Sequence, residues 1–116
     1  MFGKMFEIGS LMKQAHEFSG KIQEMNDRLK HLRIQGSAAG GLVLVDVNGL
    51  QEMVSCRIDP ALFQQGDVEL LEELIVTATN NATESSRQQQ AESMKSLTEG
   101  MNLGNLTETL EKIMPQ

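Results

Sequence analysis

The feature that most restricts the fold is a run of apolar residues near the start of the chain, spaced alternately by three and four positions. The run comprises Ile8, Leu11, Ala15, Phe18, Ile22, Met25, Leu29 and Leu32. This spacing, kept over four heptads with polar residues on the other faces, predicts a long helix with a coiled-coil seam. At 1.5 Å per residue, four heptads form a rod about 42 Å long. A globule of this size has a radius of gyration of only about 13 Å, so the helix should extend beyond its own domain.

An apolar seam on such a rod needs a surface that covers it. A second copy of the same chain is the simplest source of that surface, so we expect a homodimer. Leu11, Phe18 and Met25 are the candidate dimer contacts on this helix. Burial of the seam within a single chain is the alternative.

The middle of the chain has the pattern of antiparallel strands. Two β-rich segments, 42–47 and 50–58, flank Asn48-Gly49, a pair typical of a two-residue hairpin turn. Such a turn places Val47 opposite Leu50. With residues 32–35 as a further strand, the chain forms a three-stranded antiparallel meander that needs a helix over one face.

The register of this hairpin assigns the side chains to two faces. The buried face contains Val43, Val45, Val47, Leu50, Val54, Cys56 and Ile58. Cys56 is therefore expected to be a buried, inert thiol. The other face carries Leu42, Leu44 and Met53 beside polar residues, and these three are the candidate dimer contacts on the sheet.

Two start signals follow the strands. Asp59-Pro60 predicts a short helical turn that ends near Gly66, and Asp67 predicts the start of a longer helix closed by Gly100 and Gly104. The element order is therefore α-β-β-β-α, an α+β fold. We assign residues 1–101 to one domain and 102–116 to a partly flexible C-terminal tail.

Several functional classes are disfavoured by composition. One cysteine and two histidines cannot form an ordinary zinc site, and Gly36–Gly41 lacks the Lys and Ser or Thr of a phosphate-binding loop. No nucleophile, base and oxyanion donor come together, so we expect neither an enzyme nor a cofactor nor a metal. The longest apolar run is too short to cross a bilayer and no signal peptide is evident, which predicts a cytoplasmic protein.

Charge is unevenly distributed along the chain, whose formal net charge is −6. Residues 1–35 contain six basic and four acidic side chains, whereas residues 36–116 contain four basic and twelve acidic ones. The basic residues outside the seam are Lys13, Lys21, Arg28, Lys30 and Arg33. They could meet an anionic partner, doubled in number by dimerisation, or they could form an ordinary charged helix surface.

A series of short motifs, in order along residues 1–101, resembles the YbaB/EbfC family of bacterial nucleoid-associated proteins. The motifs are Met1-Phe-Gly-Lys4, Leu11-Met-Lys-Gln-Ala15, Gly40-Gly-Leu-Val43, Asn48-Gly49, Ile58-Asp-Pro60 and Leu71-Glu-Glu-Leu74. The resemblance implies an α-β-β-β-α protomer that pairs into a homodimer with tweezer-like helical arms. It also implies loosely specific binding of double-stranded DNA, a place in the nucleoid, and a role in nucleoid organisation and gene regulation.

The resemblance extends the candidate DNA contacts and the candidate partners. Arg87 and Lys95, the only cations of the last long helix, join the basic residues of the first helix as expected phosphate contacts. Family genes often neighbour recombination and replication factors, which implies an association with such proteins. The alternative function is a protein-interaction module whose helical arms hold a polypeptide, using Met12 and Met25 as adaptable contacts.

Overall fold

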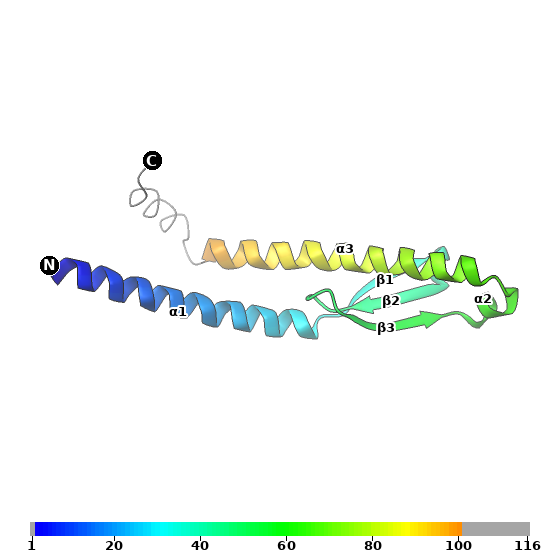
Figure 1. Cartoon of the computed structure of the whole chain (residues 1–116), viewed down its shortest axis with the longest axis horizontal. Coiled ribbons are helices and arrows are strands. Elements are labelled where there is room, and N and C mark those ends of the chain that lie inside the picture. The colour runs from blue at the N-terminus through cyan, green and yellow to red at the C-terminus, as the bar shows by residue number, and fades with distance from the viewer. Residues whose placement is uncertain (1, 101–116) are drawn as a thin grey trace, which may run out of the picture. The chain divides into compact units, whose positions relative to one another are not determined.

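The computed structural model describes the backbone of residues 2–100 and the side chains of residues 8–100. The elements are α1 (Phe2–His31), β1 (Ile34–Ala38), the 3-10 turn η1 (Ala39–Gly41), β2 (Val43–Val47), β3 (Met53–Ile58), α2 (Pro60–Gln65) and α3 (Val68–Gly100) (Figure 1). This order confirms the predicted α+β fold. Gly104 and the predicted tail lie outside the described residues.

The chain divides into two compact units. The sheet unit comprises Asn26–Glu92, and the terminal unit comprises Met1–Met25 with Ser93–Gln116. The strands and α2 belong to the sheet unit, whereas α1 and α3 are each divided between the two.

The core of the sheet unit lies between α3 and one face of the antiparallel sheet, whose strand order is β1-β2-β3 (Figure 1). Val43, Val45 and Val47 of β2 are at most 1% exposed. Small residues allow α3 to approach this closely: a Cβ at Gly36 of β1 would overlap the backbone of Ala78 and Ala82. Buried alternate residues on β1 and β2 therefore position α3 over these two strands.

The predicted hairpin register is wrong. Val47 pairs with Met53 rather than Leu50, and Val45 pairs with Cys56, with an irregularity between Asp46 and Val47. A longer loop replaces the two-residue turn because the Asn48 side chain accepts hydrogen bonds from the backbone N–H groups of Leu50 and Glu52. This use of an Asn side chain competes with a tight turn.

The prediction of a buried Cys56 is also wrong, because the thiol is exposed. Cys56 pairs with the buried Val45, so the two residues share a face of the sheet. β3 is an edge strand, however, and five of its six residues are exposed. The apolar face of β3 thus continues the core face of the sheet without being covered.

The two start signals after the sheet are confirmed. Asp59 Oδ1 accepts a hydrogen bond from the Ala61 backbone N–H at 2.9 Å, and Pro60 follows as the first residue of α2. Asp67 Oδ1 accepts one from the Leu70 N–H at 3.0 Å at the start of α3. Gly66, in the left-handed conformation with φ of 72°, ends α2 and allows the chain to turn between the helices.

Candidate nucleic-acid interface

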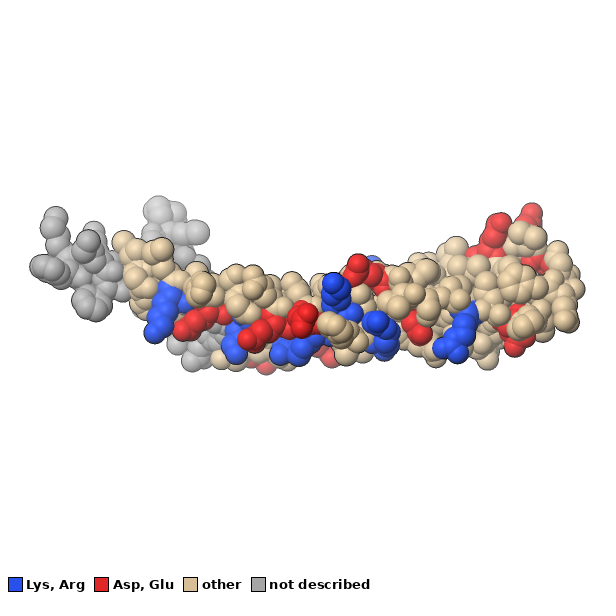
Figure 2. Space-filling model, turned by 90° about the horizontal axis from the view of Figure 1, so that it is seen from below, with Lys and Arg blue, Asp and Glu red and all other residues tan. Residues whose placement is uncertain are grey.

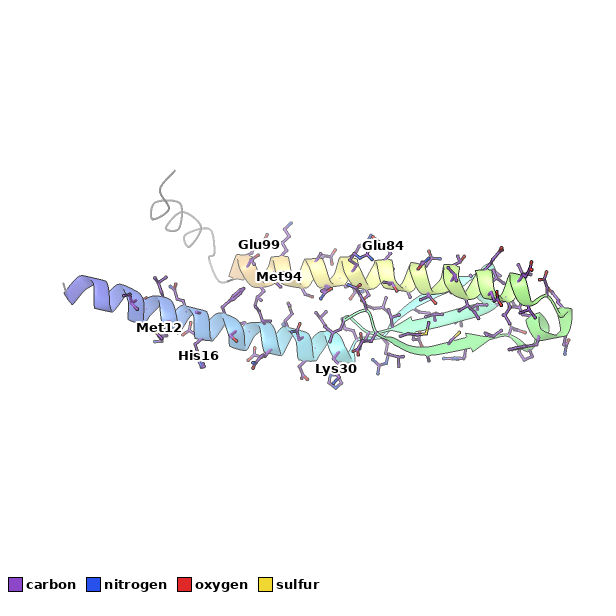
Figure 3. All side chains as sticks on the ribbon, in the orientation of Figure 1. Met12, His16, Lys30, Glu84, Met94 and Glu99 are labelled. Atoms are coloured by element: carbon purple, nitrogen blue, oxygen red, sulfur yellow. The ribbon has the colours of Figure 1, made fainter. Side chains whose placement is uncertain are left out.

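The densest set of basic residues in the sheet unit lies at the C-terminal end of α1. Arg28, Lys30 and Arg33 are all exposed, and Lys30 projects outward from the helix in Figure 3. No acidic residue occurs from position 28 to position 45. We call these three exposed cations the α1-end cluster. Arg28 and Lys30 lie on different faces of α1, with Glu24 one turn before Arg28 and Asp27 one turn before Lys30.

Hydrogen bonds in and beside this cluster close the end of the helix. Arg33 Nη1 donates to the carbonyl oxygens of Lys30 at 3.3 Å and Leu32 at 3.0 Å. His31 Nδ1 lies 2.7 Å from the Asp27 carbonyl oxygen. Cations at this end complement the negative end of the helix dipole. The Arg33 side chain thus has a structural contact of its own, while no hydrogen bond or ion pair of the Arg28 or Lys30 side chain is seen within residues 8–100.

The predicted basic residues of the terminal unit are more dispersed. Lys13 and Lys21 are exposed on α1, where Lys21 Nζ lies 3.8 Å from Glu24 Oε2. Both partners of this ion pair are more than half exposed, so it holds Lys21 only weakly. Lys95 of α3 is exposed as well.

Arg87 is the only cation of α3 within the sheet unit. Its Nη1 lies 2.8 Å from Glu84 Oε2, so an acidic partner balances its charge. Glu84 projects from the side of α3 that faces away from the sheet (Figure 3). The exposed residues near it are mainly uncharged and polar, among them Asn80, Gln88 and Gln89. Contacts of α3 with a nucleic acid would therefore rely on hydrogen bonding more than on charge.

On the face shown in Figure 2, basic side chains alternate with acidic ones and do not merge into one continuous basic surface. This agrees with the acidic net charge of −6. Attraction of a polyanion would therefore depend on local groups of cations such as the α1-end cluster.

The candidate dimer contacts differ in accessibility. Met25 is 2% exposed and is therefore already covered within the chain, whereas Leu42 is half-buried and packs against the core of the sheet unit. Phe18 and Leu44 are half-buried. Leu11 and Met53 are 41% and 50% exposed and remain open to a partner.

Two residues that were predicted to be buried share this openness. Val54, on β3, is 46% exposed, and the neighbouring Cys56 is exposed as well. The number of strands could have predicted this exposure. The last strand of a three-stranded meander is an edge strand, and a single helix need not cover its inward-facing residues.

Within residues 8–100, no group of three or more His, Cys, Asp or Glu side chains is arranged to hold a metal ion. None of the helices in the described part of the chain has the length and apolar character needed to cross a membrane.

The fold is that of an α+β protein with two long helices and a small antiparallel sheet, and it carries the basic α1-end cluster. Residues 5–101 match the model of the YbaB/EbfC DNA-binding family, and the chain belongs to this family. The resemblance seen in the sequence motifs is thereby confirmed. The family description concerns DNA binding and names no enzymatic activity.

Curated relatives and a solved structure agree with this assignment. A nucleoid-associated protein of Clostridium kluyveri is 38% identical over 102 residues, covering 88% of this chain and 90% of the relative. One of Agrobacterium fabrum is 40% identical over 99 residues, covering 85% and 92%. The crystal structure of an uncharacterized Helicobacter pylori protein shares the fold, with a TM-score of 0.66 at 21% identity, covering 78% of this chain and 91% of the other.

Proposed function

We propose that this protein binds double-stranded DNA as a homodimer with low sequence specificity, and contributes to nucleoid organisation and gene regulation. The observation that carries the proposal is the α1-end cluster, three exposed cations in a stretch without acidic residues. The family to which the chain belongs is described as DNA-binding, and relatives at 38–40% identity are named nucleoid-associated proteins. These names also support a location in the cytoplasm, at the nucleoid.

Binding of this kind is mainly electrostatic. Lys and Arg side chains neutralise phosphates and release condensed counterions. Each phosphate contact therefore makes the decrease of log affinity with log salt steeper by about 0.9. Phosphates are the same in every sequence, which explains the low specificity. Uncharged side chains of α3 such as Gln88 and Gln89 add positioning contacts to the DNA backbone.

The exposed β3 strand supports the homodimer. Met53 and Val54 are 50% and 46% exposed on an edge strand whose outer backbone groups have no partner strand among residues 2–100. Proteins generally protect such edges with charges, prolines or a covering element. Arg57 is the only charged residue of this strand. A second copy that covers β3 would remove apolar surface from water and double the number of α1-end clusters.

The test is a fluorescence-anisotropy titration of a duplex of about 30 base pairs across a salt series, comparing three proteins. Replacing Arg28 and Lys30 together by Ala should lower the affinity at least tenfold and reduce the slope against salt, because phosphate contacts are lost. Arg57→Ala is the matched control, since it removes an exposed cation outside the predicted DNA contacts. Light scattering checks that every variant keeps the same mass. Equal affinities for all three proteins would refute the site.

The acidic net charge and the exposed Met12, 69% accessible, favour a second candidate, the protein-interaction module. Capture of partners from a cell extract treated with nuclease separates the two functions. Partners that survive nuclease and a duplex that does not bind at low salt would together favour this alternative.

A further inference from the structure

The loop between β2 and β3 is closed by two backbone hydrogen bonds, from the Asn48 N–H to the Glu52 carbonyl and from the Gln51 N–H to the Asn48 carbonyl, and by the buried Asn48 side chain. Asn48 is 4% exposed, and its Oδ1 accepts hydrogen bonds from the N–H groups of Leu50 at 2.9 Å and Glu52 at 3.0 Å. Its Nδ2 donates to Glu52 Oε1 at 2.8 Å. The side chain thus satisfies three polar groups at once, which makes this loop a rigid element rather than a simple connection.

The same loop contacts the end of α1. The Gly49 N–H donates to the Leu29 carbonyl oxygen at 2.7 Å. That carbonyl belongs to the last turn of the helix and also accepts a hydrogen bond from the Leu32 N–H at 3.2 Å. A Cβ at Gly49 would overlap the Leu29 side chain and carbonyl oxygen, so the close approach requires glycine. Leu29 itself is 1% exposed.

The loop also contacts α3, through two residues one helical turn apart. Ser86 Oγ donates to the Asn48 carbonyl oxygen at 2.7 Å, and the Ser86 side chain is completely buried. Gln51 Nε2 donates to Gln90 Oε1 at 2.9 Å. One loop of five residues therefore bonds to both long helices within the sheet unit.

We propose that this loop junction, formed by Asn48, Gly49 and Gln51 with Leu29, Ser86 and Gln90, positions the two long helices for DNA binding. The inference rests on the proposed function and deepens it. Ser86 and Asn48 act through the helices that they hold, because both are buried and neither can reach a phosphate. They are positioning residues.

The physical reason is the difference between apolar and polar contacts. Small residues such as Gly36 and Ala82 permit close packing of α3 on the sheet, and the hydrogen bond of Ser86 adds a directional contact further along the helix. A buried hydroxyl bonded to a carbonyl requires one distance and one direction. Lys13 lies about 24 Å along α1 from Leu29, so a tilt of about 10° at Leu29 moves that lysine by about 4 Å. Such a shift can separate a cation from its phosphate.

The test compares Ser86→Ala with Ser85→Ala in the full chain. Ser85 precedes Ser86 on α3 but is exposed, so it is the matched control. Both variants are titrated with the duplex across the salt series, far below their melting temperatures measured by circular dichroism. We expect Ser86→Ala to bind DNA about five- to tenfold more weakly, with a slope of log affinity against log salt that is less steep by about 0.9, the value of one phosphate contact. Ser85→Ala should bind within twofold of the unaltered protein.

The slope separates positioning from stability. Loss of folded protein lowers the active fraction and leaves the number of phosphates contacted by each folded molecule unchanged. Should Ser86→Ala not fold, Gln90→Ala replaces it, with Gln64→Ala at an exposed position of α2 as the control, because the Gln51 to Gln90 bond is only half-buried. A folded junction variant that keeps the original affinity and slope would overturn the inference. Absence of DNA binding by the unaltered protein would overturn the proposed function, and this inference with it.

Discussion

At the residue scale, the packing of α3 on the sheet depends on the absence of one side chain. Changing Gly36 to Ala introduces a Cβ that overlaps the backbone of Ala78 and Ala82. We expect this overpacking to lower the free energy of unfolding by about 1–3 kcal/mol, measured by urea denaturation. Gly20→Ala is the control, because that glycine lies in α1 with nothing near its Cβ position. It should leave stability unchanged or raise it by up to about 1 kcal/mol. Equal stability of Gly36→Ala and the unaltered protein would contradict the packing.

Individual residues also show which features the sequence could reveal. Asp59 and Asp67 cap helices through bonds to residues two and three positions away, so a local pattern was sufficient to predict them. The conformation around Asn48 depends on Leu29 and Ser86, which are distant in sequence, and no local pattern indicates those contacts. The hairpin register was therefore predicted wrongly, although the number and order of the strands were predicted correctly. The first strand lies at Ile34–Ala38 rather than 32–35, and the third begins at Met53 rather than Leu50. The basic residues of α1 were identifiable as a group, but the bonds of Arg33 to the helix end required the structure.

At the element scale, β3 is the strand that most needs a partner. Lysine on an edge strand opposes pairing with another chain. Val54→Lys should therefore raise the dimer dissociation constant at least tenfold, which sedimentation velocity over a concentration series measures. Thr77→Lys, at an exposed position of α3, adds the same charge away from the strand and should leave the mass unchanged. A dimer that withstands Val54→Lys would place the interface elsewhere.

The error in the register affected Met53 and Cys56 differently: Met53 pairs with Val47 of the core face instead of lying on the opposite face, whereas Cys56 keeps its predicted face. The pairing of Val47 with Leu50 implies Glu52 opposite Val45, but Val45 lies opposite Cys56, a displacement of four residues. Because side chains alternate with a period of two along a strand, an even displacement keeps Cys56 on its predicted face. Cys56 is exposed for a different reason. A single helix, α3, packs on a three-stranded sheet and is too narrow to cover the edge strand β3.

At the scale of the whole molecule, net charge and DNA affinity are separate properties. The chain carries −6, yet phosphate contacts depend on the few cations within reach of the duplex. If Arg28 and Lys30 of each protomer contact phosphates, the four contacts predict a slope of about −3.6. Affinity should then fall about a hundredfold when salt rises from 50 to 200 mM, as measured by anisotropy. Affinity independent of salt would exclude an electrostatic mechanism.

The grading of burial along α1 has an energetic consequence. Exposure of the seam falls from 57% at Ile8 and 41% at Leu11 to 2% at Met25 and 1% at Leu29. Helical turns far from a packed end gain little stability beyond their intrinsic helix propensity, and isolated helices are only marginally stable in water. Folding of the first turns is therefore thermodynamically coupled to association: whatever covers Ile8 and Leu11 also supplies the free energy that makes those turns helical. Backbone amide hydrogen exchange should accordingly slow from Ile8 towards Leu29, and the gradient should flatten when a partner binds.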